Sequence, residues 1–413
     1  MCYTQSRFNA LLSACVMSLI ATAGWSQSLT WLGVLPNGID SEAFGVSADG
    51  AVVVGLAHNA AWQWRAFRWT ASGGMQDLGT LGGRESWAYG VSADGSVVVG
   101  WSYNAAGWYR AFRWTALGGM QDLGDLGGGW SEAWGVSADG SVVVGWSNNA
   151  AGRERAFRWT ASGGMQDLGH LGLGISWANG VSADGSVVVG RSYNAAGRVR
   201  AFRWTASGGM QDLGTLGGRE SWANGVSADG SVVVGWARNA AGRVRAFRWT
   251  ALGGMQDLGD LGGNWSYALD VSADGSVVVG YAQSASRQRN HAFRWTASGG
   301  MEDLNTTYAS LLTDGSVLWE ARAISPDGRY IVGCGQNAAT GRWEAFLLDT
   351  GPRCTAHNGD VDRNGCVDDA DLLAVLFAFG QTGSNLGRVD VNCDGVVDDA
   401  DLLQVLLNFG SGC

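Results

Sequence analysis

The ten residues Val91–Gly100, VSADGSVVVG, decide the fold because they recur through most of the chain. The string returns every 45 residues, a close variant begins at Val46, and a diverged copy, ISPDGRYIVG, begins at Ile324. The other identical copies begin at Val136, Val181, Val226 and Val271. A second marker, AFRWT, follows the same period, and its last copy has drifted to AFLLD. Repetition at this period is typical of propellers and solenoids.

Each repeat contains four short β-like segments separated by turns that contain glycine. In the second repeat they are residues 75–81, 88–93, 96–102 and 110–115, and they are rich in valine and aromatic residues. Four strands in each of seven repeats predict an all-β, seven-bladed β-propeller. Residues 29–35 would then be the first strand of the first blade, and residues 345–349 the last strand of the seventh. A β-solenoid is the alternative, although 45 residues is long for one coil.

Two details of the repeat lead to local predictions. The Asp94-Gly95 pair predicts a two-residue hairpin turn in which both residues have positive φ. The AFRWT tryptophans do not vary among the first six copies, so we expect them to pack between blades. They are Trp69, Trp114, Trp159, Trp204, Trp249 and Trp295.

The composition agrees with an all-β protein. The 413 residues include 66 glycines and only three prolines, which indicates many tight turns. The net charge of -10 disfavours nucleic acid as a partner. The acidity is local, because the chain from residue 354 onward contains ten Asp and two Arg.

The N-terminus has the pattern of a signal peptide over residues 1–26. Arg7 precedes an apolar run, and Ala21-Thr22-Ala23 is a small-x-small cleavage pattern. A lipid anchor on Cys15 is an alternative. The run is shorter than the roughly 20 apolar residues of a membrane-spanning helix, so we expect no membrane span and an extracellular or cell-surface protein.

The strongest chemical signal lies near the C-terminus. Residues 360–371, DVDRNGCVDDAD, match the twelve-residue calcium loop, with glycine at the sixth position, and residues 390–401, DVNCDGVVDDAD, repeat the pattern. Calcium prefers such oxygen ligands, so the sequence predicts two calcium ions. The predicted ligands are Asp360, Asp362, Asn364, the Cys366 carbonyl, Asp368 and Asp371 in the first loop, and Asp390, Asn392, Asp394, the Val396 carbonyl, Asp398 and Asp401 in the second.

Each loop leads into one predicted helix, 372–379 or 402–409, and no helix pattern precedes it. Two such loop-helix units with Asp at the twelfth position resemble a type I dockerin, and the final Ser-Gly-Cys resembles a cysteine-bearing variant of it. The resemblance implies calcium-dependent docking onto a cohesin-like protein or surface anchor. The partner-reading positions would be Asp369-Ala370 and Asp399-Ala400, where the familiar Ser-Thr pair is absent, so the partner stays open. A self-contained, calcium-stabilised cap is the alternative.

The repeats also resemble a family. The strings NHAFRWT at 290–296 and EARAISPDGRYIVG at 320–333 are similar to HAF-type extracellular repeat proteins. That resemblance implies an exported repeat protein and assigns no chemistry. The predicted domains are therefore a signal peptide at 1–26, the propeller at 27–352 and the dockerin-like domain at 353–413.

Positions that vary between repeats are the candidates for a ligand site in the propeller. One variable position follows the DLG turn, and Asp125, His170 and Asp260 would converge on a ligand or metal if this ring faced the central channel. Another follows VVVG and is rich in aromatic residues. It predicts either a sugar-stacking face or the filling of space at a blade edge.

Four cysteines lie in the small C-terminal domain, which fits an exported protein stabilised by disulfides. Pairing Cys354 with Cys413 and Cys366 with Cys393 would clasp the domain, although four cysteines permit three pairings. The remaining Cys334 lies in a strand pattern and is expected to be buried.

Two functions fit these observations. The first is a secreted, non-catalytic propeller for binding or display, attached through the dockerin-like domain. We assign it no catalytic residues, because every Asp-Gly and Arg is copied from blade to blade. The alternative is a carbohydrate-active component, a glycoside hydrolase or lyase of polysaccharide catabolism, which makes polysaccharide a second candidate partner.

Overall fold

The computed structural model describes residues 27–413 except 286–289, 352–356, 363, 382–385 and 393–395. The predicted signal peptide lies outside the described residues. The chain divides into two compact units, one of residues 27–353 and one that includes residues 354–413. We call them the propeller and the tail. No helix among the described residues is long and apolar enough to cross a membrane.

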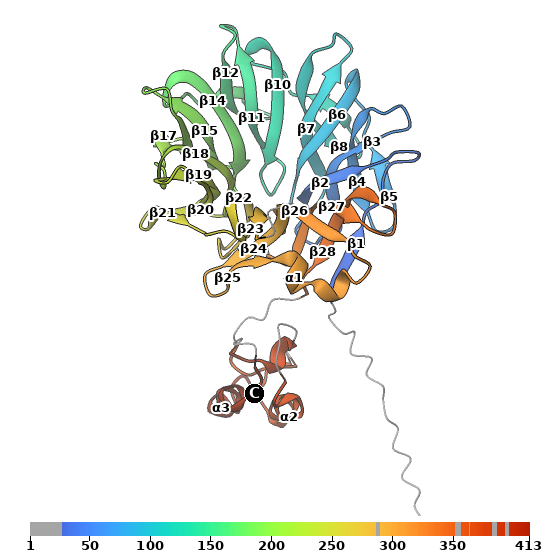
Figure 1. Ribbon diagram of the computed structural model, residues 1–413, viewed down its shortest axis with the longest axis vertical. Helices are drawn as coiled ribbons and strands as arrows, with labels where there is room; N and C mark the ends of the chain where they lie inside the picture. The colour runs from blue at the N-terminus through green and yellow to red at the C-terminus, as the bar shows by residue number, and fades with distance from the viewer. Residues whose placement is uncertain (1–26, 286–289, 352–356, 363, 382–385, 393–395) are drawn as a thin grey trace, which may run out of the picture. The chain divides into compact units, whose positions relative to one another are not determined.

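The described residues of the propeller form seven four-stranded antiparallel sheets around one axis (Figure 1), which confirms the predicted seven blades. In the first blade the order from the axis outward is β2 (Ser41–Val46), β3 (Val53–His58), β4 (Trp64–Thr70) and β5 (Gly74–Asp77). The next two blades contain β6 (Gly82–Val91), β7 (Val97–Asn104), β8 (Tyr109–Thr115) and β9 (Gly119–Asp122), then β10 (Gly127–Val136), β11 (Val142–Asn149), β12 (Glu154–Thr160) and β13 (Gly164–Asp167). The fourth and fifth contain β14 (Gly172–Val181), β15 (Val187–Asn194), β16 (Val199–Thr205) and β17 (Gly209–Asp212), then β18 (Gly217–Val226), β19 (Val232–Asn239), β20 (Val244–Thr250) and β21 (Gly254–Asp257). The sixth contains β22 (Gly262–Val271), β23 (Val277–Ser284), β24 (Asn290–Thr296) and β25 (Gly300–Asp303), and the seventh contains β26 (Val317–Ile324), β27 (Tyr330–Asn337), β28 (Arg342–Asp349) and β1 (Ser28–Trp31).

The N-terminal strand closes the ring, and this corrects the predicted phase of the blades. Strand β1 pairs antiparallel with β28, with Leu29 opposite Leu348, so it is the outermost strand of the seventh blade. It is not the first strand of the first blade. The reason is the three-residue turn 71–73 between β4 and β5, which is too short to let β5 leave its own sheet. The segment after β5 crosses to the next blade instead.

A buried serine on the innermost strand joins each of six blades to the blade before it. The Ser86 hydroxyl accepts a hydrogen bond from the Ala66 N–H at 3.0 Å and donates one to the Gly79 carbonyl at 2.6 Å. At the closing seam the Ser41 hydroxyl accepts from Ala345 N–H at 2.9 Å and donates to the Gly33 carbonyl at 2.6 Å. The equivalent serines are Ser131, Ser176, Ser221 and Ser266.

The AFRWT marker supplies further contacts between blades. In the first five blades its arginine donates to the glycine carbonyl of the next Asp-Gly loop, as Arg158 does to Gly185 at 3.0 Å. Its phenylalanine is fully buried in each of the first six blades, and its tryptophan joins an apolar cluster shared with a neighbouring blade. Five of the six tryptophans are buried and Trp159 is half-buried, as expected from the repeat.

The Asp-Gly turn differs from its prediction. The backbone of Ser92 pairs with that of Val97, so the loop has four residues, and in it only Gly95 has positive φ, 71°. The Asp94 carboxylate accepts from the Ser92 hydroxyl at 2.6 Å and from the Ser96 N–H at 3.0 Å. These hydrogen bonds lower the pKa of Asp94 to about 2. The turn is therefore stabilised by the side chain, and only one residue needs glycine's freedom.

A short insertion precedes the seventh blade. It contains α1 (Leu304–Thr307) and the 3-10 helix η1 (Ala309–Leu311). Tyr308, between them, is 1% exposed and packs in the apolar cluster of the sixth and seventh blades. The insertion thus contributes to the core of that seam.

In the tail, α2 (Asp369–Ala378) packs against α3 (Asp399–Leu407), and the 3-10 helix η2 (Gly387–Val389) precedes the second loop. Both α-helices begin three residues earlier than predicted, because Asp368 and Asp398 form capping boxes at their N-termini. The small core consists of Val367, Val375, Ala378, Val391, Val397 and Val405.

The closing serine gives a direct test of the ring. Ser41→Ala removes the acceptor of the buried Ala345 N–H, so we expect the free energy of unfolding to fall by ~1–3 kcal/mol. Urea unfolding followed by tryptophan fluorescence measures the change. Ser231→Ala is the control, because its exposed hydroxyl donates to the nearby Asp229 carboxylate at the surface, and it should change the value by less than ~0.5 kcal/mol. Equal effects of the two substitutions would contradict the role of Ser41 in closure.

Candidate metal centre

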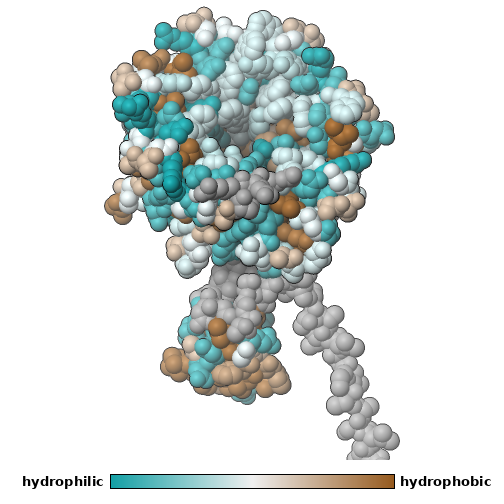
Figure 2. All heavy atoms as spheres, in the orientation of Figure 1, coloured by the Kyte–Doolittle hydropathy of each residue, from teal (hydrophilic) through white to brown (hydrophobic). Residues whose placement is uncertain are grey.

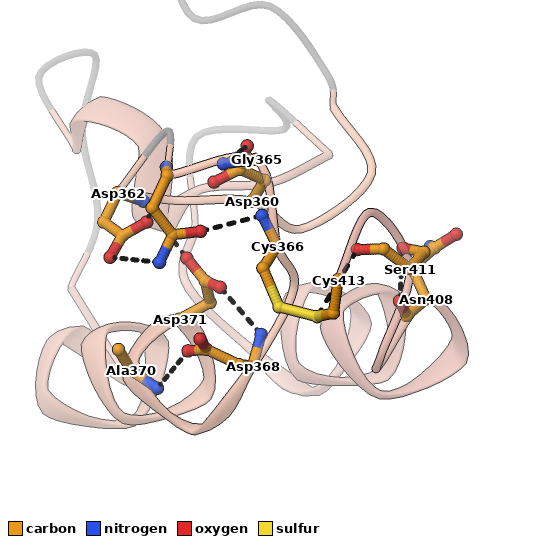
Figure 3. The surroundings of a disulfide bond; sticks show 11 residues. Asp360, Asp362, Gly365, Cys366, Asp368, Ala370, Asp371, Asn408, Ser411 and Cys413 are labelled. Atoms are coloured by element: carbon orange, nitrogen blue, oxygen red, sulfur yellow. Dashed lines mark hydrogen bonds between the residues drawn. A yellow bond between two sulfur atoms is a disulfide. The ribbon is translucent and has the colours of Figure 1, made fainter.

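Three carboxylates converge in the first loop of the tail (Figure 3). Oxygen atoms of Asp360, Asp362 and Asp371 all lie within 4.8 Å of one another. Gly365, at the sixth loop position, has φ of 91°, so the backbone turns there in a conformation that side-chain residues rarely adopt. The loop thereby returns toward Asp360, whose Oδ2 accepts from the Gly365 N–H at 3.3 Å.

Asp371 organises this loop from the first turn of α2. Its Oδ1 accepts from the N–H groups of Val361 at 2.7 Å and Asp362 at 3.1 Å, and its Oδ2 accepts from Asp368 N–H at 2.9 Å. The carboxylate is fully buried. Asp371 therefore fixes the beginning and the end of the loop in one place.

The cluster has the chemistry of a cation site. Asp360 Oδ1 is buried and has no hydrogen-bond partner among the residues that the structure describes, which is costly for an ionised oxygen. Carboxylates held this close also repel one another unless a cation balances them. A hard divalent cation with oxygen ligands satisfies both requirements.

The other predicted ligands of the first loop lie around this cluster. Asn364 donates from its side chain to Asp362 Oδ2 at 3.1 Å and accepts from Cys366 N–H at 2.7 Å. Asp368 Oδ1 accepts from the Ala370 N–H at 2.9 Å and caps α2. The structure thus groups Asp360, Asp362 and Asp371, and uses Asp368 as the helix cap.

The second loop repeats the arrangement. Asp401 Oδ1 accepts from Val391 N–H at 2.6 Å and from Asn392 N–H at 3.0 Å, and Asp401 Oδ2 accepts from Asp398 N–H at 2.9 Å. Asp390 is 3% exposed. Val396 lies in an isolated bridge position before α3, and the predicted ligand Asp394 lies outside the described residues.

The predicted partner-reading positions, Asp369-Ala370 and Asp399-Ala400, are exposed at the starts of α2 and α3. The sequence prediction missed the larger apolar surface beside them. Figure 2 shows apolar side chains over the side of the tail where α2 and α3 lie. The exposed large residues, which we call the apolar face, are Leu373, Leu376, Phe377, Phe379, Leu403, Leu406, Leu407 and Phe409. The signal was available in the sequence, because apolar residues occupy nearly every position of both helices after the first turn.

One disulfide corrects the suggested pairing. Cys366, in the first loop, is bonded to Cys413 at the C-terminus (Figure 3). The alternative partners Cys354 and Cys393 lie outside the described residues. The pairing follows from the course of the chain, because the Ser411 carbonyl accepts from Val367 N–H at 3.0 Å and brings the last residues beside the loop. Cys334 is buried, as predicted.

The predicted ring in the propeller does not form a common site. Asp125 pairs with Arg110 of its own blade and accepts from Gly127 N–H at 2.6 Å, and Asp260 pairs with Arg245. His170 is exposed, and its pKa is lowered by partial burial and by nearby Arg155. The central cavity, of about 490 Å³, is lined by residues of other positions, including Phe44, Tyr89, Trp134, Asn179, Asn224 and Arg322.

Near this cavity the charged side chains are engaged with each other. Arg322 pairs with both Glu42 and Glu320 at 2.9 Å. Desolvation raises the pKa of Glu42, although Arg322 opposes that shift. The variable position after VVVG fills space rather than forming an exposed face: Arg191, for example, stacks on Trp222 with its guanidinium carbon 3.6 Å from the ring centre.

No family model matches the sequence, and no curated protein matches it. Solved structures with some similarity include a putative TolB from Agrobacterium tumefaciens, with 15% identity and a TM-score of 0.42 over 63% of this chain and 88% of that one. TolB from Acinetobacter baumannii has 12% identity and a TM-score of 0.44 over 74% and 65% of the two chains. Hydrazine synthase from Kuenenia stuttgartiensis has 12% identity and a TM-score of 0.41 over 75% and 95%. Similarity at this level assigns no ligand and no activity.

Proposed function

We propose that this chain is an exported, non-catalytic propeller for binding or display, attached to a cohesin-like protein or surface anchor by a calcium-dependent, dockerin-type tail. The observation that carries the proposal is the duplicated loop and helix. In both halves an Asp at the twelfth position accepts three backbone N–H groups and the following helix exposes apolar residues.

Calcium suits the first loop better than a softer metal. The converging side chains offer oxygen atoms only, which calcium and magnesium prefer over the nitrogen and sulfur ligands of zinc. The twelve-residue spacing with glycine at the sixth position favours calcium, whose coordination is larger and more flexible than that of magnesium.

The apolar face supports a docking role. The two halves of the tail contribute matching positions, on the helices and just after them: Leu373 with Leu403, Leu376 with Leu406, Phe377 with Leu407, and Phe379 with Phe409. Phe377 is 80% exposed and Leu407 is 76% exposed. A concentration of large exposed side chains on so small a unit is typical of a protein interface. Because the halves match, either helix can occupy the same partner pocket.

The described residues near the axis support a binding role rather than catalysis. Glu42 and Glu320 are both held by Arg322, and the Glu132 carboxylate accepts from the Trp134 indole at 2.9 Å. These carboxylates therefore serve as structural partners of neighbouring side chains.

Calcium removal tests the metal assignment. Chelation should abolish amide-exchange protection in α2 and α3 and leave the propeller strands protected, because part of the binding free energy of the ion stabilises the folded tail. The double substitution Asp360→Ala with Asp390→Ala should reproduce this effect in the presence of calcium. Asp369→Ala with Asp399→Ala is the matched control, since both residues are exposed and outside the cluster.

The comparison must include reduced samples, because the Cys366–Cys413 disulfide constrains the tail without metal. Unchanged protection of the reduced tail after chelation would show that calcium does not stabilise it.

Substitution of the apolar face tests docking. The immobilised full chain should retain a defined partner from the native exoproteome in calcium and release it on chelation. Phe377→Asp with Leu407→Asp should abolish retention and preserve calcium binding, because these side chains are exposed and are not among the predicted calcium ligands. Leu117→Asp with Leu252→Asp, fully exposed on propeller turns, should retain the partner. Retention that is independent of calcium, or that survives the first pair of substitutions, would contradict docking through this face.

A further inference from the structure

The loops between the second and third strands of the blades lie together at one end of the propeller. They share the sequence Asn-Ala-Ala-Gly in blades two to five. The asparagine side chain organises the loop: Asn104 Oδ1 accepts from the N–H groups of Ala106 and Trp108, each at 3.0 Å. The glycine has positive φ, as at Gly107, where φ is 82°. We call this end the Asn-loop face.

The first blade has an exposed tryptophan where this loop has glycine in blades two to five. Trp62 occupies the glycine position and has φ of 59°, a conformation in which a bulky side chain is rare. Its side chain is 70% exposed, so no burial offsets the unfavourable backbone. A strained residue that presents an indole to solvent is a reason to look for a ligand.

Other exposed aromatic side chains lie on the two blades that flank the blade of Trp62. Trp343 in the seventh blade and Trp108 in the second are 36% and 44% exposed, and these blades lie on either side of the first. A continuous series of ring contacts underlies Trp62 and Trp108, with centroid distances of 3.5–6.3 Å. It passes through His58, Trp64, Trp87, Trp101, Tyr109 and Trp130. The aromatic surface is therefore supported from below and held in place.

The same face is basic on the next three blades. The residue that follows the loop glycine is Trp108 in the second blade but Arg153, Arg198 and Arg243 in the third, fourth and fifth. All three arginines are exposed. Within the described part of the chain none of them forms an ion pair, whereas the arginines two residues further on pair with Asp167, Asp212 and Asp257. The Arg153 guanidinium also donates to the Leu173 carbonyl at 3.4 Å. The Asn-loop face thus combines exposed aromatic side chains with exposed guanidinium groups that lack a carboxylate partner among the described residues.

We propose that the Asn-loop face binds an acidic polysaccharide. The apolar faces of sugar rings stack on Trp62 and Trp108, and uronate carboxylates accept hydrogen bonds from Arg153, Arg198 and Arg243. Three arginines spaced over three blades fit carboxylates that recur along a sugar chain. A nucleic acid carries a charge on every nucleotide and requires a denser basic surface. This ligand class rests on the proposed role of the propeller as the binding unit, and it is independent of the tail.

Polygalacturonate is the probe for the test, with dextran sulfate, a neutral glucan and single-stranded DNA as comparisons. Binding of the full chain is measured by affinity electrophoresis and biolayer interferometry in the presence of chelator. The wild-type chain should bind polygalacturonate more tightly than any of the three comparisons. Because the probe itself binds calcium, chelator keeps the measurement specific to the propeller.

Trp62→Gly is the decisive variant. It restores the residue found at this position in other repeats, so it should raise or preserve the melting temperature while weakening polygalacturonate binding at least tenfold. The triple substitution Arg153→Ala, Arg198→Ala and Arg243→Ala should weaken binding similarly and reduce its dependence on salt. Leu117→Ala with Leu252→Ala, at the turns between third and fourth strands, should leave binding unchanged.

Several outcomes would overturn the inference. These are no binding of polygalacturonate, equal or tighter binding of DNA or of the neutral glucan, and unchanged binding by Trp62→Gly. Dextran sulfate binding that equals polygalacturonate binding and that Trp62→Gly does not weaken would show charge attraction alone. If polygalacturonate fails to bind while α2 and α3 still respond to calcium, the ligand class is wrong and the proposed attachment stands.

Discussion

The propeller depends on contact between neighbouring blades, because a four-stranded sheet with two apolar faces cannot bury either face alone. The fully buried phenylalanines lie in apolar clusters shared by two blades, and buried serines join the same blades through the backbone. Nearly identical repeats therefore form nearly identical contacts between neighbouring blades, which we call joints. The ring must also close, and the closing joint pairs residues 304 positions apart, Ser41 and Ala345. Closure uses the same serine geometry as the internal joints, with β1 as the added outer strand.

This constraint separates the conserved part of each repeat from the part that varies. The residues between blades repeat almost without change, whereas loop residues and positions near the axis differ from blade to blade. Trp62 and Arg153 occupy neighbouring positions of the same loop in different blades, and both are exposed. The fold therefore leaves the Asn-loop face available for recognition. In the tail, too, different residues have different roles. Carboxylates cluster in the loops, and exposed apolar side chains lie on the helices.

The number of blades, the burial of the AFRWT tryptophans and the grouping of Asp360 with Asp371 could all be predicted, because each follows from periodicity or from fixed spacing. The phase of the blades could not. The segment after AFRWT has the same strand pattern whether it pairs within its own blade or in the next one. The short turn 71–73 keeps it in its own blade. The predicted type of the Asp-Gly turn was wrong, because hydrogen bonds of the Ser92 and Asp94 side chains stabilise a four-residue loop. In that loop only one residue needs a positive φ. The Cys366–Cys413 pairing and the separation of Asp125 from Asp260 depend on the path of the chain in space, which short motifs do not contain.

The central claim is that two units fold separately and serve separate functions, one attaching and one binding. Differential scanning calorimetry of the full chain tests this most directly, because a ligand raises the melting temperature of the unit that binds it. The account predicts two transitions: calcium should raise the transition of the tail alone, and polygalacturonate in chelator should raise that of the propeller alone. A single transition, or one ligand that shifts both transitions, would contradict it.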